Sequence, residues 1–225
     1  MMNQALFLQI LMALASIMML IPYYMAFKEG CRRYMASELK LSGNNKYTFM
    51  YYSGFFISLI WFVMPFIDQP RMALNVFSLF EAKENVWGNA IYVVMLLAFM
   101  VYFMSVWGTK VMNYNLRATK DRFLHPSELV TYGPYAKVRN PMIMGDLFNH
   151  LSLVLLTGAV YTLYLYVIYI IIDIVIVEIE NRYSIYVHFK KEYDEYAKRI
   201  PAYMNRELWL WTILYIAIIG VNFYL

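Results

Sequence analysis

The chain of 225 residues is 62% hydrophobic and 19% aromatic, whereas only 15% of its residues are charged. Its mean hydropathy is +0.49. A soluble domain of this length could not bury so many apolar side chains. The net charge of +4 is too small to indicate nucleic-acid binding, and the single cysteine, Cys31, excludes an intrachain disulfide. We therefore predict an all-α integral membrane protein, built as a polytopic bundle of transmembrane helices.

Apolar runs long enough to cross a bilayer recur along the chain. The first, residues 5–27, carries no charge and lacks the basic start of a signal peptide, so we expect it to remain as a span. Two further runs cover about 47–67 and 87–107. We predict one membrane domain over residues 1–225, in which residues 1–107 supply the first three spans.

The next apolar stretch, residues 142–177, is too long for one span at about 1.5 Å per residue. Its Thr157-Gly158-Ala159 sequence offers a bend, so we predict two antiparallel helices in a tight hairpin. A last run, 208–225, brings the total to about six spans, and we assign 207–225 as the final segment of the domain.

Charged stretches between these runs predict the orientation of the bundle. Residues 28–46, 108–141 and 178–206 carry more basic than acidic side chains, whereas 68–84 carries more acidic ones. The positive-inside rule therefore places the first three stretches in the cytoplasm and both termini outside.

Residues 186–200 show a helical pattern of their own. Apolar and aromatic side chains follow the spacing of one helical face, and charged side chains fill the other faces. The pattern predicts an amphipathic helix at the cytoplasmic end of the bundle. Its apolar face consists of Tyr186, Phe189, Tyr193, Tyr196 and Ile200.

Polar side chains also occur inside the predicted hairpin, where each charge costs roughly 3 kcal/mol on insertion scales. One face of the first helix carries Asp146, Asn149 and His150. One face of the second carries Tyr166, Tyr169, Asp173 and Glu180. The two stripes indicate either a polar groove open to the cytoplasm or hydrogen bonds that only join the helices. With three histidines and no HExxH spacing, we expect no metal site.

Three sequence blocks occur in order after residue 128: LVTYGPYAKVRNPMIMG (129–145), EIENRY (178–183) and FKKEYDEYAKRIP (189–201). Together they resemble the C-terminal half of the isoprenylcysteine carboxyl methyltransferase and phospholipid methyltransferase superfamily. The resemblance implies an integral membrane enzyme that uses S-adenosylmethionine. It also implies a cytoplasm-facing cofactor pocket within 108–206, covered by the last conserved helix, and a lipid-side entrance for the acceptor.

The resemblance also implies a set of site residues. Its cofactor-binding positions are Gly133, Pro134, Tyr135, Asn140, Pro141, Gly145, Glu180, Tyr193 and Tyr196. Our catalytic candidates are Arg139, Glu180 and Asp146. Arg139 would orient an anionic acceptor or the cofactor carboxylate, or else reach lipid headgroups. Tyrosine faces and the Glu180 carboxylate would favour the cationic sulfonium of the cofactor.

The chain departs from the family pattern at several positions. Asn140 stands where histidine is commoner, Ile143 replaces a tyrosine, and Lys190 replaces the glycine that follows the conserved phenylalanine. The family's glutamate pair has two possible counterparts here. It corresponds either to Glu178 with Glu180 or to Glu180 with Asn181.

Two other functions stay open at this point. The sequence RNPMIMGDL (139–147) also resembles a motif of NADPH-dependent membrane sterol reductases, although the LVTYGPY lead-in has the methyltransferase form. A non-catalytic membrane scaffold is the third possibility, because Ile143 and the glutamate pair depart from the pattern. We predict an S-adenosylmethionine-dependent methyltransferase whose acceptor is lipidic or amphipathic. The acceptor group is either the carboxylate of an isoprenylcysteine-like group or a phospholipid amine.

Overall fold

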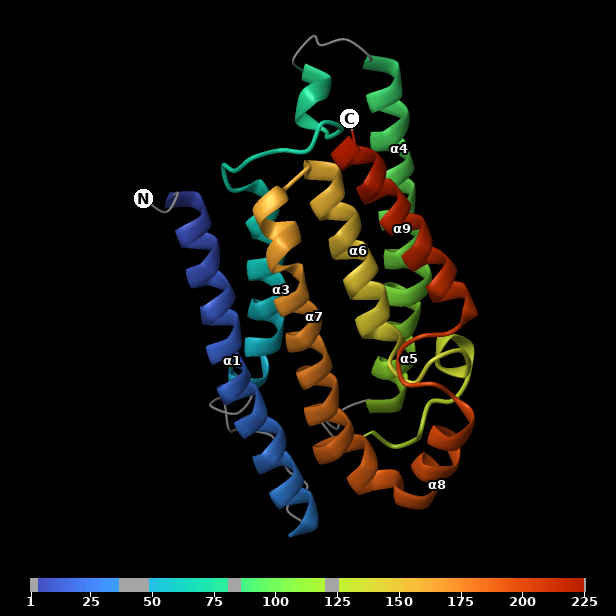
Figure 1. Ribbon diagram of the computed structural model, residues 1–225. Coiled ribbons are helices and arrows are strands. Elements are labelled where there is room, and N and C mark those ends of the chain that lie inside the picture. Colours follow the sequence, from blue (N-terminus) through green and yellow to red (C-terminus); the bar gives the residue numbers. More distant parts are fainter. Residues whose placement is uncertain (1–3, 37–48, 81–85, 120–125, 225) are drawn as a thin grey trace.

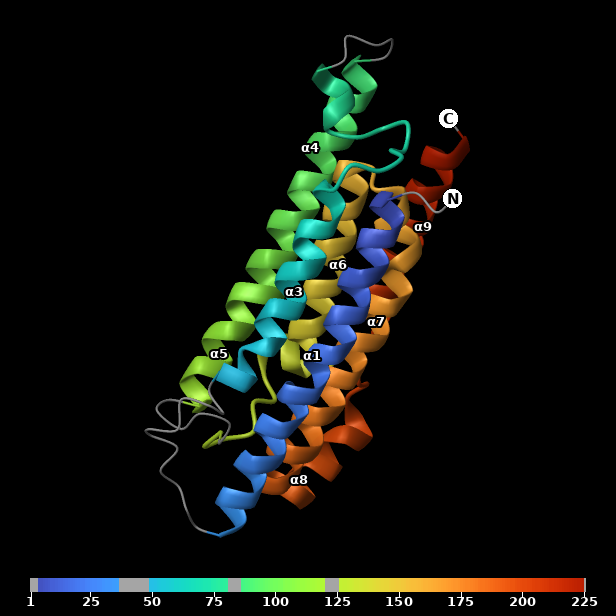
Figure 2. The ribbon, with the colours of Figure 1, turned by 90° about the vertical axis from the view of Figure 1, so that its left-hand side faces the viewer.

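Long helices run side by side along one axis in the computed structural model, which describes residues 4–36, 49–80, 86–119 and 126–224 (Figures 1 and 2). Within these ranges the only β pairing is an isolated bridge between Arg71 and Ala159. Among the described residues, five helical segments are long and apolar enough to cross a membrane, and the apolar helix Pro141–Thr157, with 17 residues, is shorter. The prediction of an all-α polytopic bundle with about six spans is confirmed.

The helices follow the predicted order. The first part of the chain forms α1 (Gln4–Met35), α3 (Ser53–Val63), the 3-10 turns η1 (Met64–Phe66) and η2 (Phe77–Phe80), and α4 (Val86–Tyr102). The π-helical segment η3 (Phe103–Thr109) joins α4 to α5 (Lys110–Thr119). After the turn η4 (Gly133–Ala136) come α6 (Pro141–Thr157) and α7 (Val160–Glu180). The π-helical η5 (Asn181–Ile185) leads into α8 (Tyr186–Arg199), and α9 (Arg206–Tyr224) follows.

The third span is longer than predicted. The sequence suggested a helix that ends near residue 107 and a polar stretch after it, but the helix continues through η3 and α5 to Thr119. In α5, Val111 and Ala118 are buried, whereas Lys110 and Arg117 are exposed. Polar side chains on one face therefore did not mark a helix end, because the opposite face still packs against the bundle.

The predicted hairpin between α6 and α7 is present and turns at Gly158. This residue has a φ of +67°, and its N–H donates to the carbonyl of Leu155 over 3.1 Å. Its own carbonyl accepts a hydrogen bond of 2.8 Å from the backbone N–H of Met72, so the segment after α3 covers the turn. Nearby, the Arg71 guanidinium donates to the carbonyl of Thr157 over 3.0 Å, at the end of α6 where carbonyls have no helical partner.

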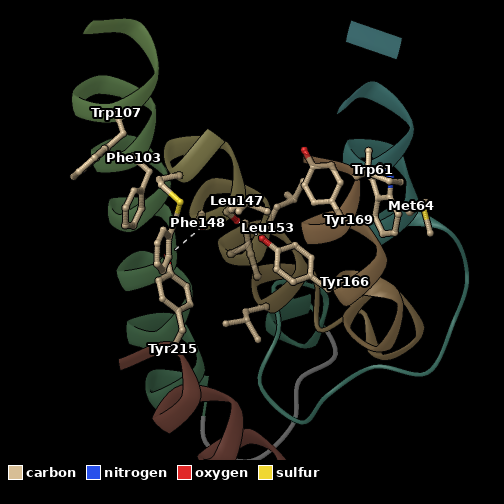
Figure 3. Packing of buried hydrophobic residues seen from close by; sticks show 14 of the residues in the cluster. Trp61, Met64, Phe103, Trp107, Leu147, Phe148, Leu153, Tyr166, Tyr169 and Tyr215 are labelled. Carbon is tan, nitrogen blue, oxygen red and sulfur yellow. Dashed lines mark hydrogen bonds between the residues drawn. The ribbon is translucent and has the colours of Figure 1, made fainter. Parts of the chain in front are cut away.

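Aromatic packing holds α6 in the middle of the bundle (Figure 3). Phe148 of α6 stacks on Phe103 of η3 with ring centroids 4.9 Å apart and an interplanar angle of 11°. Tyr169 of α7 stacks on Trp61 of α3 at 4.9 Å and 26°. Tyr166 donates a hydrogen bond to the backbone carbonyl of Leu147. These contacts join α6 to η3 and α7, and α7 in turn to α3.

The two ends of the bundle differ. At one end α8 turns beneath the bundle next to η5, and this helix matches the amphipathic helix predicted over 186–200 (Figure 1). α1 begins and α9 ends at the opposite end, as expected for alternating spans (Figures 1 and 2). Parts of the charged stretches, residues 37–48, 81–85 and 120–125, lie outside the described residues. The cytoplasmic orientation stays a prediction.

Replacing Gly158 with alanine should destabilise the fold. A Cβ would lie 2.8 Å from Cβ of Asn75, and a residue with a side chain at positive φ costs about 1–2 kcal/mol by itself. We expect the thermal unfolding midpoint of the detergent-purified protein to fall by several degrees. The control is Gly220→Ala in α9, where a Cβ meets nothing within 4 Å. Equal midpoints for the two variants would contradict this account of the turn.

Lys190 provides a second test, because its backbone (φ 30°, ψ −99°) is non-helical inside α8. Strain of this kind costs about 1–3 kcal/mol in a residue with a side chain, more than the roughly 0.5–1 kcal/mol that glycine loses in chain entropy. We expect Lys190→Gly to raise the unfolding midpoint. Lys191→Gly, which removes the same charge from a regular helical position, should lower it. A lower midpoint for both would show that Lys190 is not strained.

Candidate active site

A cavity of about 440 Å³ lies between α5, α6, η5 and α8. One part of its wall is polar, with Arg139, Asn140, Glu180 and the two tyrosines Tyr193 and Tyr196. Another part is apolar and comes from α5 and the start of α6. The apolar wall consists of Met112, Leu116, Met142 and Ile143.

Backbone hydrogen bonds join the first sequence block (129–145) to the end of the third (189–201) beside this cavity. The N–H of Arg139 donates to the carbonyl of Pro201 over 2.8 Å, and the N–H of Asn140 donates to the carbonyl of Ala202 over 3.1 Å. The Asn140 side chain adds a hydrogen bond of 3.0 Å to the same carbonyl. Because proline at position 141 keeps Asn140 out of the helix, these N–H groups point to the other block instead of into α6.

The tyrosines of α8 bind the same segment. The Tyr196 hydroxyl donates to the carbonyl of Tyr135 over 2.6 Å. Arg139 donates to the Tyr193 hydroxyl over 3.0 Å, and its guanidinium carbon lies 5.6 Å from the centre of that ring. The Nε atom of Arg139 is buried and has no hydrogen-bond partner among the described residues. Arg139 also lines the cavity, so it is the cationic residue of the polar wall.

Tyr135 connects the site to α5, which the sequence analysis had treated as part of a polar stretch. Its hydroxyl donates to Oδ1 of Asn115 over 2.6 Å, and burial raises the pKa of Tyr135, so it remains a neutral donor. Asn115 also lines the cavity. Only helical continuation to Thr119 places this residue there, and no motif in the sequence singled it out.

The structure separates the two possible glutamate pairs. Glu180 and Asn181 both line the cavity, and Asn181 donates from Nδ2 to Oδ1 of Asn140 over 3.3 Å. Glu178 is exposed and accepts a hydrogen bond of 3.2 Å from the Tyr203 hydroxyl. Burial, followed by the nearby Glu178 carboxylate, raises the pKa of Tyr203 to about 12. The geometry therefore favours Glu180 with Asn181 as the counterpart of the family's pair.

Asp146 lies outside the cavity lining. It accepts a hydrogen bond from the Tyr169 hydroxyl, and its Oδ1 is 3.2 Å from Nδ1 of His150. These contacts join the two predicted polar stripes of α6 and α7 by hydrogen bonds between and within the helices. Of the α7 stripe, only Glu180 is among the residues that line the cavity. The pattern fits the structural interpretation of the stripes better than an open groove.

Three of the predicted cofactor-binding residues shape the backbone near the cavity. Gly133 has a φ of +63°, and a Cβ there would lie 2.7 Å from the Tyr114 ring. Pro134 is buried, and its carbonyl accepts hydrogen bonds from the two backbone N–H groups that follow the turn. A Cβ on Gly145 would lie 2.7 Å from Cβ of Trp107, so this glycine allows α6 to approach η3. Pro141 begins α6 and does line the cavity.

Two aromatic residues of the N-terminal half, Phe27 and Tyr51, also line the cavity. The sequence carried no signal for them, because aromatic residues are common throughout the spans. Within the described part of the chain, no three His, Cys, Asp or Glu side chains cluster in a way that would hold a metal ion.

Comparison with known proteins identifies the domain that contains most of this site. Residues 89–191 match the family model described as phospholipid methyltransferase, which confirms the resemblance seen in the sequence blocks. Comparisons with curated proteins and with solved structures gave no match. The matched residues run from α4 into α8 and include Arg139, Asn140 and Glu180. The matched stretch is a little under half of the chain and lies within the polytopic membrane bundle.

Proposed function

We propose that the protein transfers the methyl group of S-adenosylmethionine to an amine on a membrane lipid. The observation that carries this proposal is the two-sided cavity, in which charged groups and tyrosines face an apolar wall that is partly open to the surroundings. The family match supports a membrane methyltransferase in general. The identity of the methyl donor and of the acceptor belongs to the proposal.

The polar wall fits the methyl donor. S-Adenosylmethionine supplies an electrophilic methyl group on a cationic sulfonium. The Arg139 guanidinium, which lines the cavity, is suited to a carboxylate, such as that of the methionine part. The Glu180 carboxylate and the faces of Tyr193 and Tyr196 are suited to a cation. Arg139, Asn140, Glu180 and the two tyrosines would therefore hold the donor.

The apolar wall fits a lipid acceptor. Met112, Leu116 and Met142 line the cavity, yet 46%, 59% and 49% of their surfaces are exposed. In a membrane bundle such side chains contact lipid, so an acyl chain could follow them while the headgroup enters the cavity. The protein would then accelerate methyl transfer mainly by holding the two reactants in line and by excluding water.

The charges of the cavity favour an amine over a carboxylate as the acceptor group. Its charged lining residues are Arg139, Glu128 and Glu180, so acidic side chains outnumber the single basic one. In the transfer, the amine nitrogen forms a bond to the methyl carbon as the carbon–sulfur bond breaks, and the nitrogen loses a proton. A protonated amine has no free lone pair, so the proton must leave before the nitrogen–carbon bond forms, and the Glu180 carboxylate would hold the amine and accept that proton. We also propose that the cavity faces the cytoplasm, because basic stretches gather at its end of the bundle.

Calorimetry on the detergent-purified full chain tests the methyl donor. We expect S-adenosylmethionine to bind with micromolar affinity, Glu180→Ala and Asn140→Ala to weaken binding about tenfold or more, and NADPH to give no signal. Glu29→Ala is the control, since it removes an acidic side chain that pairs with Arg32 and Arg33 outside the cavity lining. Binding of NADPH alone would support the reductase alternative, and silence from both ligands in folded protein would support the scaffold.

Methyl transfer in vesicles tests the acceptor. Protein reconstituted with labelled S-adenosylmethionine should label phosphatidylethanolamine, whereas vesicles of phosphatidylglycerol, which lacks an amine, should stay unlabelled. Farnesylcysteine added to the latter vesicles supplies a lipidic carboxylate. Label on farnesylcysteine and none on the amine lipid would overturn the assignment of an amine acceptor while leaving the methyl donor in place.

A further inference from the structure

We infer that Tyr23 of α1 is a positioning residue that orients the Glu180 carboxylate in the cavity. The two residues are 157 positions apart, and Tyr23 lies outside the residues that match the methyltransferase family. The inference rests on the proposed function, because it assigns Tyr23 a role through a residue that would hold the methyl donor and the acceptor amine.

The hydroxyl of Tyr23 donates a hydrogen bond to Oε1 of Glu180. The tyrosine is only 3% exposed, so this bond is shielded from solvent. It is the one hydrogen bond that the Glu180 side chain makes among the described residues, and the carboxylate itself lines the cavity. Rotation about the terminal bond of a glutamate is otherwise broad. A fixed donor on Oε1 therefore leaves Oε2 as the oxygen available to a ligand.

The ring of Tyr23 is itself held in place by the N-terminal half of the chain. It stacks on Tyr51 with centroids 5.9 Å apart and an interplanar angle of 23°, and it lies 5.0 Å from the ring of Phe27. A Cβ on Gly54 of α3 would come within 2.6 Å of the Tyr23 ring. Because only glycine leaves this space, α3 presses against the ring and fixes where its hydroxyl points.

The packing of α1 explains how a residue so distant in sequence reaches the site. α1 lies beside α7 and η5 along the bundle (Figures 1 and 2). The neighbouring residue Tyr24 points elsewhere and meets the Tyr183 hydroxyl at 3.3 Å. Adjacent tyrosines on one helix thus have different partners, and only Tyr23 contacts a residue that lines the cavity.

The test is a double-mutant cycle on the full chain, with S-adenosylmethionine binding measured by calorimetry. Tyr23→Phe removes one hydroxyl and keeps the ring, so we expect the unfolding midpoint to be retained and the Kd to rise about tenfold. Glu180→Gln should also weaken binding. Since Tyr23 acts through Glu180, the double variant should bind no more weakly than Glu180→Gln alone. Tyr24→Phe, the matched control, should bind like the unmodified protein.

A second variant, in α3, tests the same hydrogen bond between Tyr23 and Glu180 by moving the Tyr23 ring. Gly54→Ala keeps the hydroxyl but displaces the ring, and we expect it too to raise the Kd. If the unmodified protein binds S-adenosylmethionine and Tyr23→Phe binds equally well, the inference is overturned and the proposed function stands. Additive effects of Tyr23→Phe and Glu180→Gln would also overturn it, because they would show that Tyr23 acts through packing. Failure of the unmodified protein to bind would overturn the proposed function, and the role of Tyr23 with it.

Discussion

The hydrogen bonds between residues 139–140 and 201–202 are the constraint on which the rest of the site depends. Proline at position 141 ends the extended segment and begins α6, so the N–H groups of Arg139 and Asn140 have no helical partner. They find carbonyls in the segment after α8 instead. This pairing joins the segment after α8 to the start of α6, and Tyr193 and Tyr196 of α8 line the cavity beside it.

The membrane-spanning part of the bundle explains why so many polar side chains lie away from the cavity. Polar groups that cannot reach water need partners inside the protein. Between α6 and α7, Tyr169 donates to Asp146, and Nδ1 of His150 lies 3.2 Å from both the Tyr169 hydroxyl and Oδ1 of Asp146. At the opposite end, Arg71 donates to three carbonyls, including that of Thr157, and so secures the hairpin turn. These contacts hold α6 and α7 in place. The charged residues that line the cavity are Glu128, Arg139 and Glu180.

The N-terminal half gives the site a second layer. The family match begins at residue 89, yet Phe27 and Tyr51 line the cavity and Tyr23 bonds to Glu180. Part of the cavity wall therefore comes from outside the matched stretch. Acceptor contacts in particular need not be confined to the three sequence blocks, because Phe27 and Tyr51 line the cavity and lie outside all three.

Much of the architecture followed from the sequence by itself. The lengths of the apolar runs determined the number of spans, Gly158 predicted the hairpin turn, and the spacing of residues 186–200 predicted α8, because each of these signals is local. The sequence blocks also predicted that Arg139, Asn140 and Glu180 belong to one site. Tertiary structure decided the rest. It separated Glu180 from Glu178, moved Asp146 out of the cavity lining, and extended the third span to Thr119 so that Asn115 reaches Tyr135. It alone paired Tyr23 with Glu180, since a contact across 157 residues depends on how helices pack and leaves no periodic trace in the chain.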